Sequence, residues 1–319
     1  MTFFGLSGIV RGEKQSGGMP VASGWVVRYG GQAKELAGGS RKMKKKQEFG
    51  RKIIELVDGL PIFPHEIDKL LAAALKPSEE RGEILRLMEK EPEARKELLE
   101  LTRSYYATDE EIETTEEAVE RFGVQNLVQL IGLLYARRAI QEEFASLRYL
   151  NEYFDHSENI SIGCHILAEH TGASREQVQL YTVSGLIHDI GRLAIMVARN
   201  RTSAHVLGTL WDKMASVVYD EEASVGTNHC EVGMRICRKW KFSPIIQEGV
   251  LRHHSPIVDS DFSIPGAIIF VSHFLSASDP SGDIVSSLSA GEVLSKLGLT
   301  RGDFDKSRYI YKSRTGDKN

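Results

Sequence analysis

The stretch Gly185-Leu186-Ile187-His188-Asp189-Ile190-Gly191-Arg192 decides which fold and which site we expect of this chain of 319 residues. It places an imidazole next to a carboxylate in an apolar run, with a glycine on each side of the pair. A neutral imidazole offers a nitrogen ligand and a carboxylate can bridge two cations, so the pair suits a metal site at the end of a helix. The dipeptide itself is common, and its meaning depends on the histidines elsewhere in the chain.

Most of the ten histidines form one ordered series with this pair. The further members are His156, with Glu152 one helical turn before it, and then His229, His253, His254 and His273. Such a series is typical of a metal centre assembled from several helices. The other histidines are interpreted as core or surface residues with local hydrogen bonds: His65, His165, His170 and His205.

Composition excludes several classes of protein. The formal net charge of −4 gives no indication that a nucleic-acid polymer or an anionic membrane is a partner. Three cysteines are too few for a disulfide framework or a zinc ribbon, which favours a reducing cytoplasm. One of them, Cys230, stands beside a predicted ligand, but we expect its side chain to point elsewhere. The longest apolar runs are too short to span a bilayer, so we expect a cytoplasmic protein.

The hydrophobic spacing predicts an all-α fold, a multi-helix bundle. Apolar residues recur at helical spacing from residue 48 onward, and the first half of this region shows no alternating strand pattern. We expect an irregular or disordered extension over 1–47, an N-terminal helical sub-domain over 48–147, a metal-binding helical sub-domain over 148–285, and C-terminal helices with a frayed tail over 286–319. A short strand around 25–29 is the rival prediction for the extension, and Met43 is a candidate for the native start.

Two blocks of the chain resemble a known family. Leu60-Pro61-Ile62-Phe63-Pro64 and Ala118-Val119-Glu120-Arg121-Phe122-Gly123-Val124 resemble the front of an HDOD domain, the HD-related output domain of bacterial signalling proteins. The segments around the paired and single histidines of the second half resemble the larger HD superfamily. Many HDOD domains have lost the metal-binding residues and are thought to act as regulatory or scaffolding modules. This chain keeps those residues.

The retained residues resemble the dinuclear centre of the HD-GYP phosphodiesterases. The resemblance implies a ligand set with one metal on His156, His188 and Asp189, and the other on Asp189, His229, His253 and His254. Asp189 would bridge the two ions, and Glu152 matches an extra carboxylate ligand. Because His253 and His254 diverge by about 100° on a regular helix, both can bind only if the helix ends there or the metals straddle it.

Three positions depart from the family pattern. His273 stands where the superfamily has an aspartate, and Arg192 replaces a lysine with a planar fork that can still grip phosphate. Ser255-Pro256-Ile257-Val258 replaces the Gly-Tyr-Pro signature, so the resemblance does not extend to cyclic-dinucleotide specificity. Asp189 and Arg192 are the predicted catalytic residues, and for Arg192 a structural salt bridge is the alternative.

The donor set leaves more than one function open. So many imidazole and carboxylate donors favour two divalent ions of iron or manganese, with nickel or zinc as alternatives. The leading hypothesis is a metal-binding regulatory module with a signalling protein as partner. The second is a metal-dependent phosphohydrolase acting on a phosphate-containing small molecule, since two metals about 3.5–4 Å apart can activate water and clamp a phosphoryl oxygen. The resemblance also raises di-iron oxidation, for which no residue here indicates a substrate.

Overall fold

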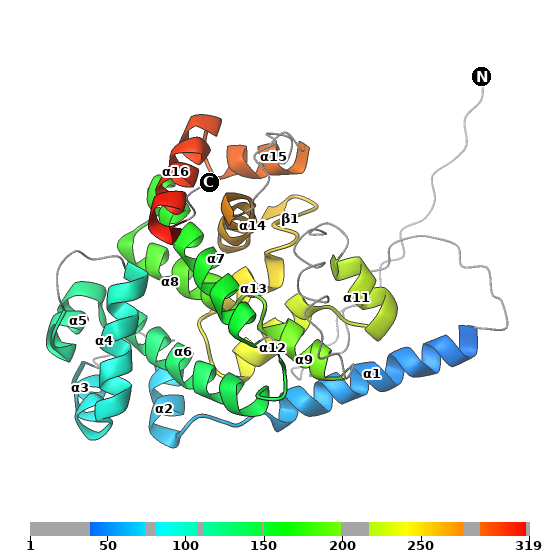
Figure 1. Cartoon of the computed structure of the whole chain (residues 1–319), viewed down its shortest axis with the longest axis horizontal. Coiled ribbons are helices and arrows are strands. Elements are labelled where there is room, and N and C mark those ends of the chain that lie inside the picture. The colour runs from blue at the N-terminus through cyan, green and yellow to red at the C-terminus, as the bar shows by residue number, and fades with distance from the viewer. Residues whose placement is uncertain are drawn as a thin grey trace, which may run out of the picture. The chain divides into compact units, whose positions relative to one another are not determined.

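The computed structural model describes residues 39–73, 81–106, 112–148, 150–198, 217–276 and 288–316. Within these ranges the regular secondary structure is helical apart from one short hairpin, which confirms the all-α prediction (Figure 1). The helices are α1 (Gly39–Gly59), α2 (His65–Ala73), α3 (Arg81–Lys90), α4 (Pro92–Tyr106), α5 (Thr115–Phe122), α6 (Val124–Glu143), α7 (Leu150–His170), α8 (Arg175–Ile187), α9 (Ile190–Ala198), α11 (Val217–Val225), α12 (His229–Lys239), α13 (Pro244–Arg252), α14 (Ile264–Ser276), α15 (Leu288–Lys296) and α16 (Arg301–Thr315). The hairpin pairs β1 (Ile257–Val258) with β2 (Asp261–Phe262).

Helix α1 begins earlier than the hydrophobic pattern predicts. It starts at Gly39, so the irregular extension expected over 1–47 is wrong for residues 39–47. That segment lacks an apolar stripe, but lysine, arginine, methionine and glutamine are good helix formers, so the helix can extend backwards from its amphipathic part. Residues 1–38, with the rival strand around 25–29, lie outside the described residues.

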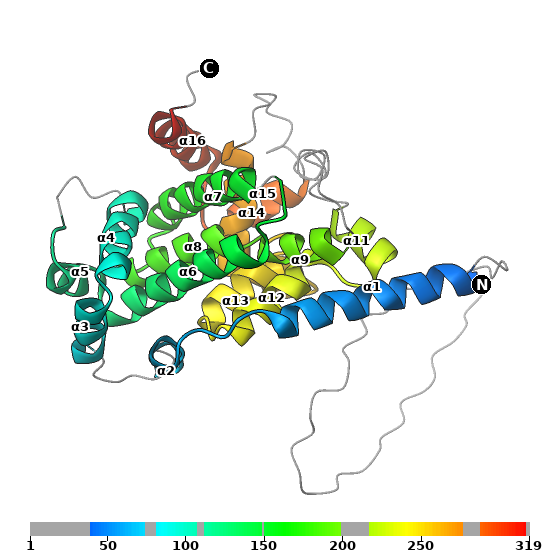
Figure 2. The same ribbon diagram turned by 60° about the horizontal axis from the view of Figure 1, so that its bottom comes forward.

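Two groups of buried apolar side chains hold the described helices together. The larger core is formed mainly by α1 to α6, α9, α12 and α13. The smaller core lies among α7, α14, α15 and α16. Helix α8 contributes side chains to both cores, and it lies beside α6 and α7 in both ribbon views (Figure 2). The two cores therefore meet along α7 and α8, and the His-Asp pair follows directly at the end of α8.

The two glycines that flank the His-Asp pair explain why this stretch sits where it does. A Cβ atom on Gly185 would lie 2.9 Å from the Ser161 Cα of α7, and one on Gly191 only 2.0 Å from the His229 carbonyl oxygen of α12. Because glycine has no Cβ, the backbone can approach both neighbouring helices closely. These approaches bring the helices that carry His156 and His229 to the pair.

Helix α13 ends just before the paired histidines. It begins at the Ser243 N-cap, whose hydroxyl accepts a hydrogen bond from the Ile246 amide, with Pro244 in the first turn. Its last residue is Arg252, and His253 and His254 lie in the turn that follows. The helix therefore ends before the two histidines, which is one of the conditions under which both can face one site. The Arg252 guanidinium then donates to the Asp261 carboxylate and fixes the hairpin beside this turn.

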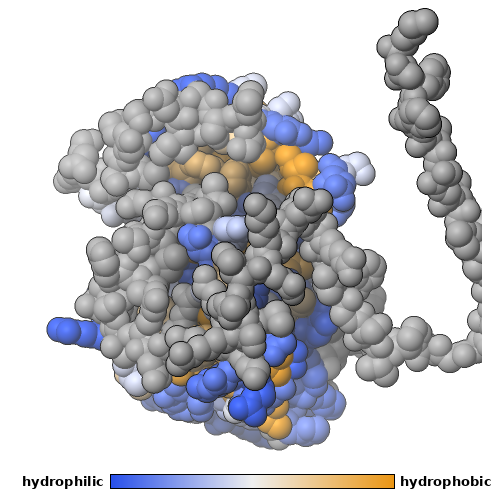
Figure 3. All heavy atoms as spheres, turned by 90° about the vertical axis from the view of Figure 1, so that its right-hand side faces the viewer, coloured by the Kyte–Doolittle hydropathy of each residue, from blue (hydrophilic) through white to orange (hydrophobic). Residues whose placement is uncertain are grey.

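One helical stretch of the described residues, Arg175–Ala198, is long and apolar enough to cross a membrane, but 94% of its most apolar window is buried inside the protein. A buried core helix of a soluble protein has the same composition. Where described residues are visible on the face in Figure 3, hydrophilic residues alternate with separate hydrophobic patches.

Candidate metal centre

Six histidines and Asp189 converge between the two cores. His156 comes from α7 and His273 from α14, while His188 and Asp189 occupy the turn between α8 and α9. His229 is the first residue of α12, and His253 and His254 follow α13. The ring centroids of neighbouring histidines lie 4.3 to 6.2 Å apart. The structure thus brings together every histidine of the predicted ligand set.

The histidines divide into two groups on either side of Asp189. The first group is His156, His188 and His273, whose possible ligand atoms lie within 4.8 Å of one another. The Nε2 atoms of His156 and His188 are 3.3 Å apart. They lie 3.8 and 3.3 Å from the Oδ2 atom of Asp189.

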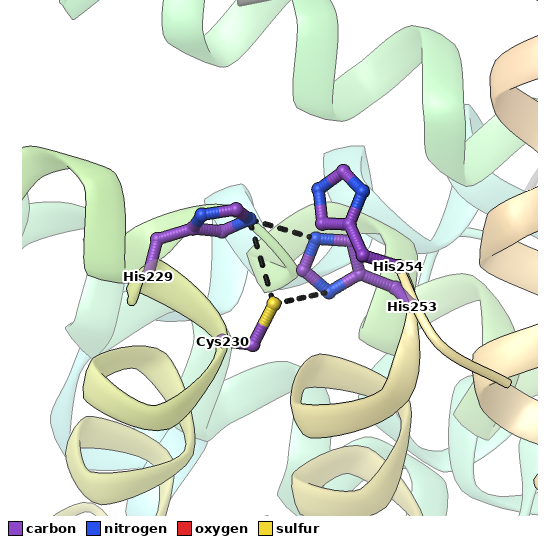
Figure 4. A group of neighbouring side chains, drawn as sticks. All are labelled: His229, Cys230, His253 and His254. Carbon is purple, nitrogen blue, oxygen red and sulfur yellow. Dashed lines mark hydrogen bonds between the residues drawn. The ribbon is translucent and has the colours of Figure 1, made fainter. Parts of the chain in front are cut away.

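The second group is His229, His253 and His254, drawn in Figure 4 together with Cys230. The Nε2 atoms of His229 and His253 are 3.1 Å apart. They lie 3.3 and 3.5 Å from the Oδ1 atom of Asp189. Asp189 therefore presents one carboxylate oxygen to each group, which is the placement that a bridging ligand needs.

Hydrogen bonds on the outer side of the rings direct their inner nitrogens to the centre. The Nδ1 atoms of His188, His253 and His273 donate to the carbonyl oxygens of Gly185, Val250 and Ile269 at 2.7, 2.7 and 2.9 Å. The Nδ1 atom of His229 bonds to the Glu221 carboxylate at 2.6 Å. In a neutral ring a protonated Nδ1 leaves a lone pair on Nε2, which is the arrangement of metal-binding histidines.

These contacts fit a divalent metal better than they fit an empty core. In neutral rings the facing Nε2 atoms of His229 and His253 are both acceptors, and an acceptor pair needs a cation between them. Among the described residues no hydrogen-bond partner reaches the buried Oδ2 of Asp189 or Nε2 of His273. Two nitrogens about 2.1 Å from one ion lie about 3.0 to 3.4 Å apart at angles of 90° to 109°. The observed spacings of 3.1 and 3.3 Å fall in this range.

Arg192 lies inside the centre and not at its surface. Its Nε atom donates to Asp189 Oδ1 at 2.8 Å, and an NH2 to His254 Nε2 distance of 3.4 Å joins it to the second group. Its side chain is 2% exposed. This ion pair with Asp189 is the structural salt bridge that the sequence analysis gave as the alternative role for Arg192. A phosphate contact by Arg192 stays a prediction.

Burial and charge determine the protonation of the centre. Burial lowers the pKa of His156, His254 and His273 well below the ordinary value, and neighbouring imidazoles lower it further. Burial likewise lowers the pKa of His253 to about 4. Burial alone would raise the pKa of Asp189, but Arg192 and His188 hold it well below its usual range. At neutral pH these rings are therefore neutral and the carboxylate is ionised, as ligands must be.

Two expectations about single residues need correction. Glu152 is exposed, and its carboxylate is not among the ligand atoms that gather within 4.8 Å. The spacing of four residues does align it with His156 along α7, but Glu152 lies nearer the helix start, where that helix is solvated. Cys230 does not point elsewhere: its Sγ atom lies 3.6 Å from His229 Nε2 and 3.9 Å from His253 Nδ1 (Figure 4). Burial raises the pKa of this thiol well above its ordinary value.

Glu221 is a functional candidate that the sequence pattern missed. It lies on α11, is 4% exposed, and its Oε2 atom accepts hydrogen bonds from both the backbone amide and Nδ1 of His229. Burial alone would raise its pKa, but the contacts with His229 keep the pKa below the ordinary value. It belongs to the acidic run Asp220-Glu221-Glu222, and nothing in that run distinguishes the residue that faces inward.

The remaining histidines have the local roles expected of them where they are described. The His165 ring lies 3.4 Å from the Thr182 hydroxyl and 3.5 Å from the Glu169 carboxylate. The Nδ1 atom of His170 lies 2.6 Å from the Ser307 hydroxyl, and His65 is exposed. His205 lies outside the described residues.

Comparison with known proteins places these features in a family. The HDOD domain model matches residues 60–256, more than half of the chain. No curated protein matches the chain.

Three solved structures share the fold at low sequence identity. A putative phosphohydrolase from Shewanella amazonensis SB2B superposes with a TM-score of 0.61 at 20% identity, covering 83% of this chain and 97% of its own. An HDOD domain protein with unknown function from Geobacter sulfurreducens superposes with a TM-score of 0.60 at 20% identity, covering 86% and 96%. A putative signal transduction protein from Marinobacter aquaeolei VT8 has a TM-score of 0.55 at 16% identity, covering 88% and 65%. At these identities the likeness concerns the fold.

Proposed function

The chain belongs to the HDOD family, and from that premise we propose that it is a metal-binding regulatory module of bacterial signal transduction. One observation carries the metal-binding part of the proposal. Imidazole nitrogens and the two oxygens of Asp189 face one another in a buried space, while their outer atoms are held by carbonyl oxygens and Glu221. Burying so many inward lone pairs without a cation would be unfavourable.

The donor set supports an assignment of the metal. Six imidazoles and one bridging carboxylate supply more ligands than one closed tetrahedral zinc site uses. Two ions of iron or manganese, which accept nitrogen and oxygen donors in six-coordinate sites, therefore fit best, with nickel or zinc as alternatives.

The regulatory part of the proposal rests on the family and on how the centre is built into the fold. The ligands join α7 and α14 of the smaller core to the helices of the larger core. A metal that binds only the folded chain stabilises it by linkage, so bound metal would hold together the helical surface that a signalling protein recognises. We place this module in the cytoplasm, where its three free cysteines stay reduced.

The second candidate function is a metal-dependent phosphohydrolase acting on a phosphate-containing small molecule. The observation that favours it is Asp189, whose two oxygens serve two histidine groups as a two-metal hydrolase requires. Two bound ions would supply an activated water and charge stabilisation for a phosphoryl group. Arg192, the second predicted catalytic residue beside Asp189, would have to leave its buried salt bridge to contact that group.

The test uses the full chain purified without added metal and again after growth with iron or manganese. Elemental analysis gives the bound metal, and a panel of cyclic dinucleotides, cyclic mononucleotides and nucleoside phosphates measures turnover. Asp189→Asn is the inactive reference because it removes the charge shared by both groups. The matched control is Asp155→Asn, an exposed aspartate next to His156.

The proposal expects bound metal in the wild type and in Asp155→Asn, loss of metal in Asp189→Asn, and no turnover across the panel. Turnover that disappears in Asp189→Asn would instead establish the phosphohydrolase. A wild-type protein that takes up no metal from supplemented medium or in dialysis would overturn both candidates.

A further inference from the structure

We infer that Glu221 is a positioning residue that makes the second group, His229, His253 and His254, the tighter-binding half of the metal centre. The inference rests on the metal-binding function proposed above. Glu221 acts on the metal only through His229 and is not itself a ligand.

The contacts of Glu221 fix His229 twice. One carboxylate oxygen, Oε2, accepts from the His229 backbone amide at 2.8 Å and from its Nδ1 at 2.6 Å. The first bond holds the start of α12, and the second sets the ring rotation and keeps the proton on Nδ1. The side chains of His229 and Glu221 are 0% and 6% exposed, so water does not compete for these bonds.

The partner of His229 differs in kind from the partners of three other rings. His188, His253 and His273 donate to carbonyl oxygens three or four residues earlier in their own helical turns. A carboxylate is a charged acceptor, and a hydrogen bond to it is shorter and stronger than one to a neutral carbonyl. It therefore makes the opposite nitrogen of the ring a better electron donor to a metal.

Charge gives Glu221 a second role, because Arg192 lies beside the second group. The guanidinium contacts Asp189 Oδ1 at 2.8 Å and lies 3.4 Å from His254 Nε2, so its positive charge opposes a cation on that side. The negative charge of Glu221 offsets Arg192, so the second group keeps the net attraction of Asp189 for a divalent ion. Without Glu221 the second group would lose both the orientation of the His229 ring and the negative charge that offsets Arg192.

Isothermal titration of the full, metal-free chain with Mn²⁺ tests the inference. The wild type should bind in two steps of unequal affinity. His254→Ala should remove the tighter step and His273→Ala the weaker one. Glu221→Gln should weaken the tighter step by 10- to 100-fold, the usual effect of losing such a partner, and change the weaker step less than about 3-fold. Glu221→Asp, which keeps the charge, should restore part of the affinity.

The neighbouring Glu222→Gln is the matched control, because Glu222 is exposed and bonds to the Asn228 side chain instead of to a histidine. It should leave both steps unchanged. Equal weakening of both steps in Glu221→Gln would mean that Glu221 only supports the fold, and no weakening would mean that it has no role. Either result overturns the inference while metal binding stands.

The assignment of the tighter binding step to the second group is tested even if Glu221→Gln does not fold. If His273→Ala removes the tighter step, or the wild type binds both ions equally well, the second group is not the tighter half. If the wild type binds no Mn²⁺, Fe²⁺ or Co²⁺ at all, the proposed function fails together with the inference.

Discussion

The first and second histidine groups contain the same residue type at similar spacings, yet they are held in place differently. In the first group His188 and His273 are anchored by carbonyl oxygens of their own helical turns. In the second group His229 depends on Glu221 from another helix, and His254 faces the side chain of Arg192. The first arrangement forms wherever its helices form, whereas the second also needs charged side chains brought from elsewhere. Asp189 presents one carboxylate oxygen to each group, so a change at this residue should affect both groups.

Asp189→Asn should have the largest effect because it breaks both groups at once. It removes the negative charge that both ions need and leaves the buried Arg192 guanidinium without its carboxylate partner. Removing one partner of a buried ion pair costs about 3–5 kcal/mol, so the free energy of unfolding in urea should fall by about that amount. The control Asp58→Asn removes an exposed pair with Arg235 and should cost less than about 1 kcal/mol. Equal losses in the two variants would contradict the central place of Asp189.

Acid should destabilise the metal-free protein through both groups. In the folded chain burial lowers the pKa of His253 to about 4, and the pKa values of His156, His254 and His273 are also lowered by burial. Because the unfolded chain then takes up protons first, the unfolding free energy is highest above about pH 6.5. It should fall as the pH decreases from about 6.5 to about 4, by up to about 1.4 kcal/mol per pH unit for each such histidine.

Urea unfolding at several values between pH 7.5 and 4.5 measures this slope. His253→Gln should make the profile shallower, because glutamine does not titrate. The lowered pKa values of Asp189 and Glu221 keep these carboxylates ionised over the same range, so they do not cancel the slope. A stability that rises on acidification to pH 5 would contradict the protonation states assigned to the centre.

Local features of the centre could be predicted from the sequence because their causes are local. The His188-Asp189 turn carries its flanking glycines within the same eight residues. The end of α13 before the paired histidines follows from a geometric condition on adjacent residues. The order of helices and the apolar stripes follow from periodicity, which each segment shows by itself.

The rest of the centre depends on contacts between distant segments. Three acidic residues occur in a row at 220–222, and the docking of α11 alone selects Glu221 to face His229. The spacing of Glu152 and His156 indicates one helix face but not which end of that face is buried. The expectation that the Cys230 side chain points away from the site is wrong for the same reason. The direction of this side chain follows from the packing of α12 against the turn after α13.

Gly191→Ala tests the second group through the backbone. The new Cβ would lie 2.0 Å from the His229 carbonyl oxygen, so α9 and α12 must move apart. We expect a loss of about 1–3 kcal/mol in urea unfolding and weaker metal binding at the second group than at the first. Gly82→Ala is the control, because its new Cβ meets nothing closer than 4.0 Å and a helical alanine should be neutral or stabilising by up to about 1 kcal/mol. Equal metal loss from both groups would show that they are not independent.

Cys230→Ala should have the smallest effect, although its sulfur lies beside the second group. The thiol lies 3.6 Å from His229 Nε2, but it approaches His253 at Nδ1, the nitrogen already bonded to the Val250 carbonyl, so it lies at the edge of the second group. Burial also raises its pKa well above the ordinary value, which keeps it protonated. We expect a loss of about 1 kcal/mol from removing one buried sulfur and a change in Co²⁺ affinity below 3-fold. Cys237→Ala, a buried cysteine of the same helix, is the control. A cobalt–thiolate absorption band in the wild type that disappears only in Cys230→Ala would make Cys230 a ligand, and the two groups would then differ in their donor atoms as well as in their supports.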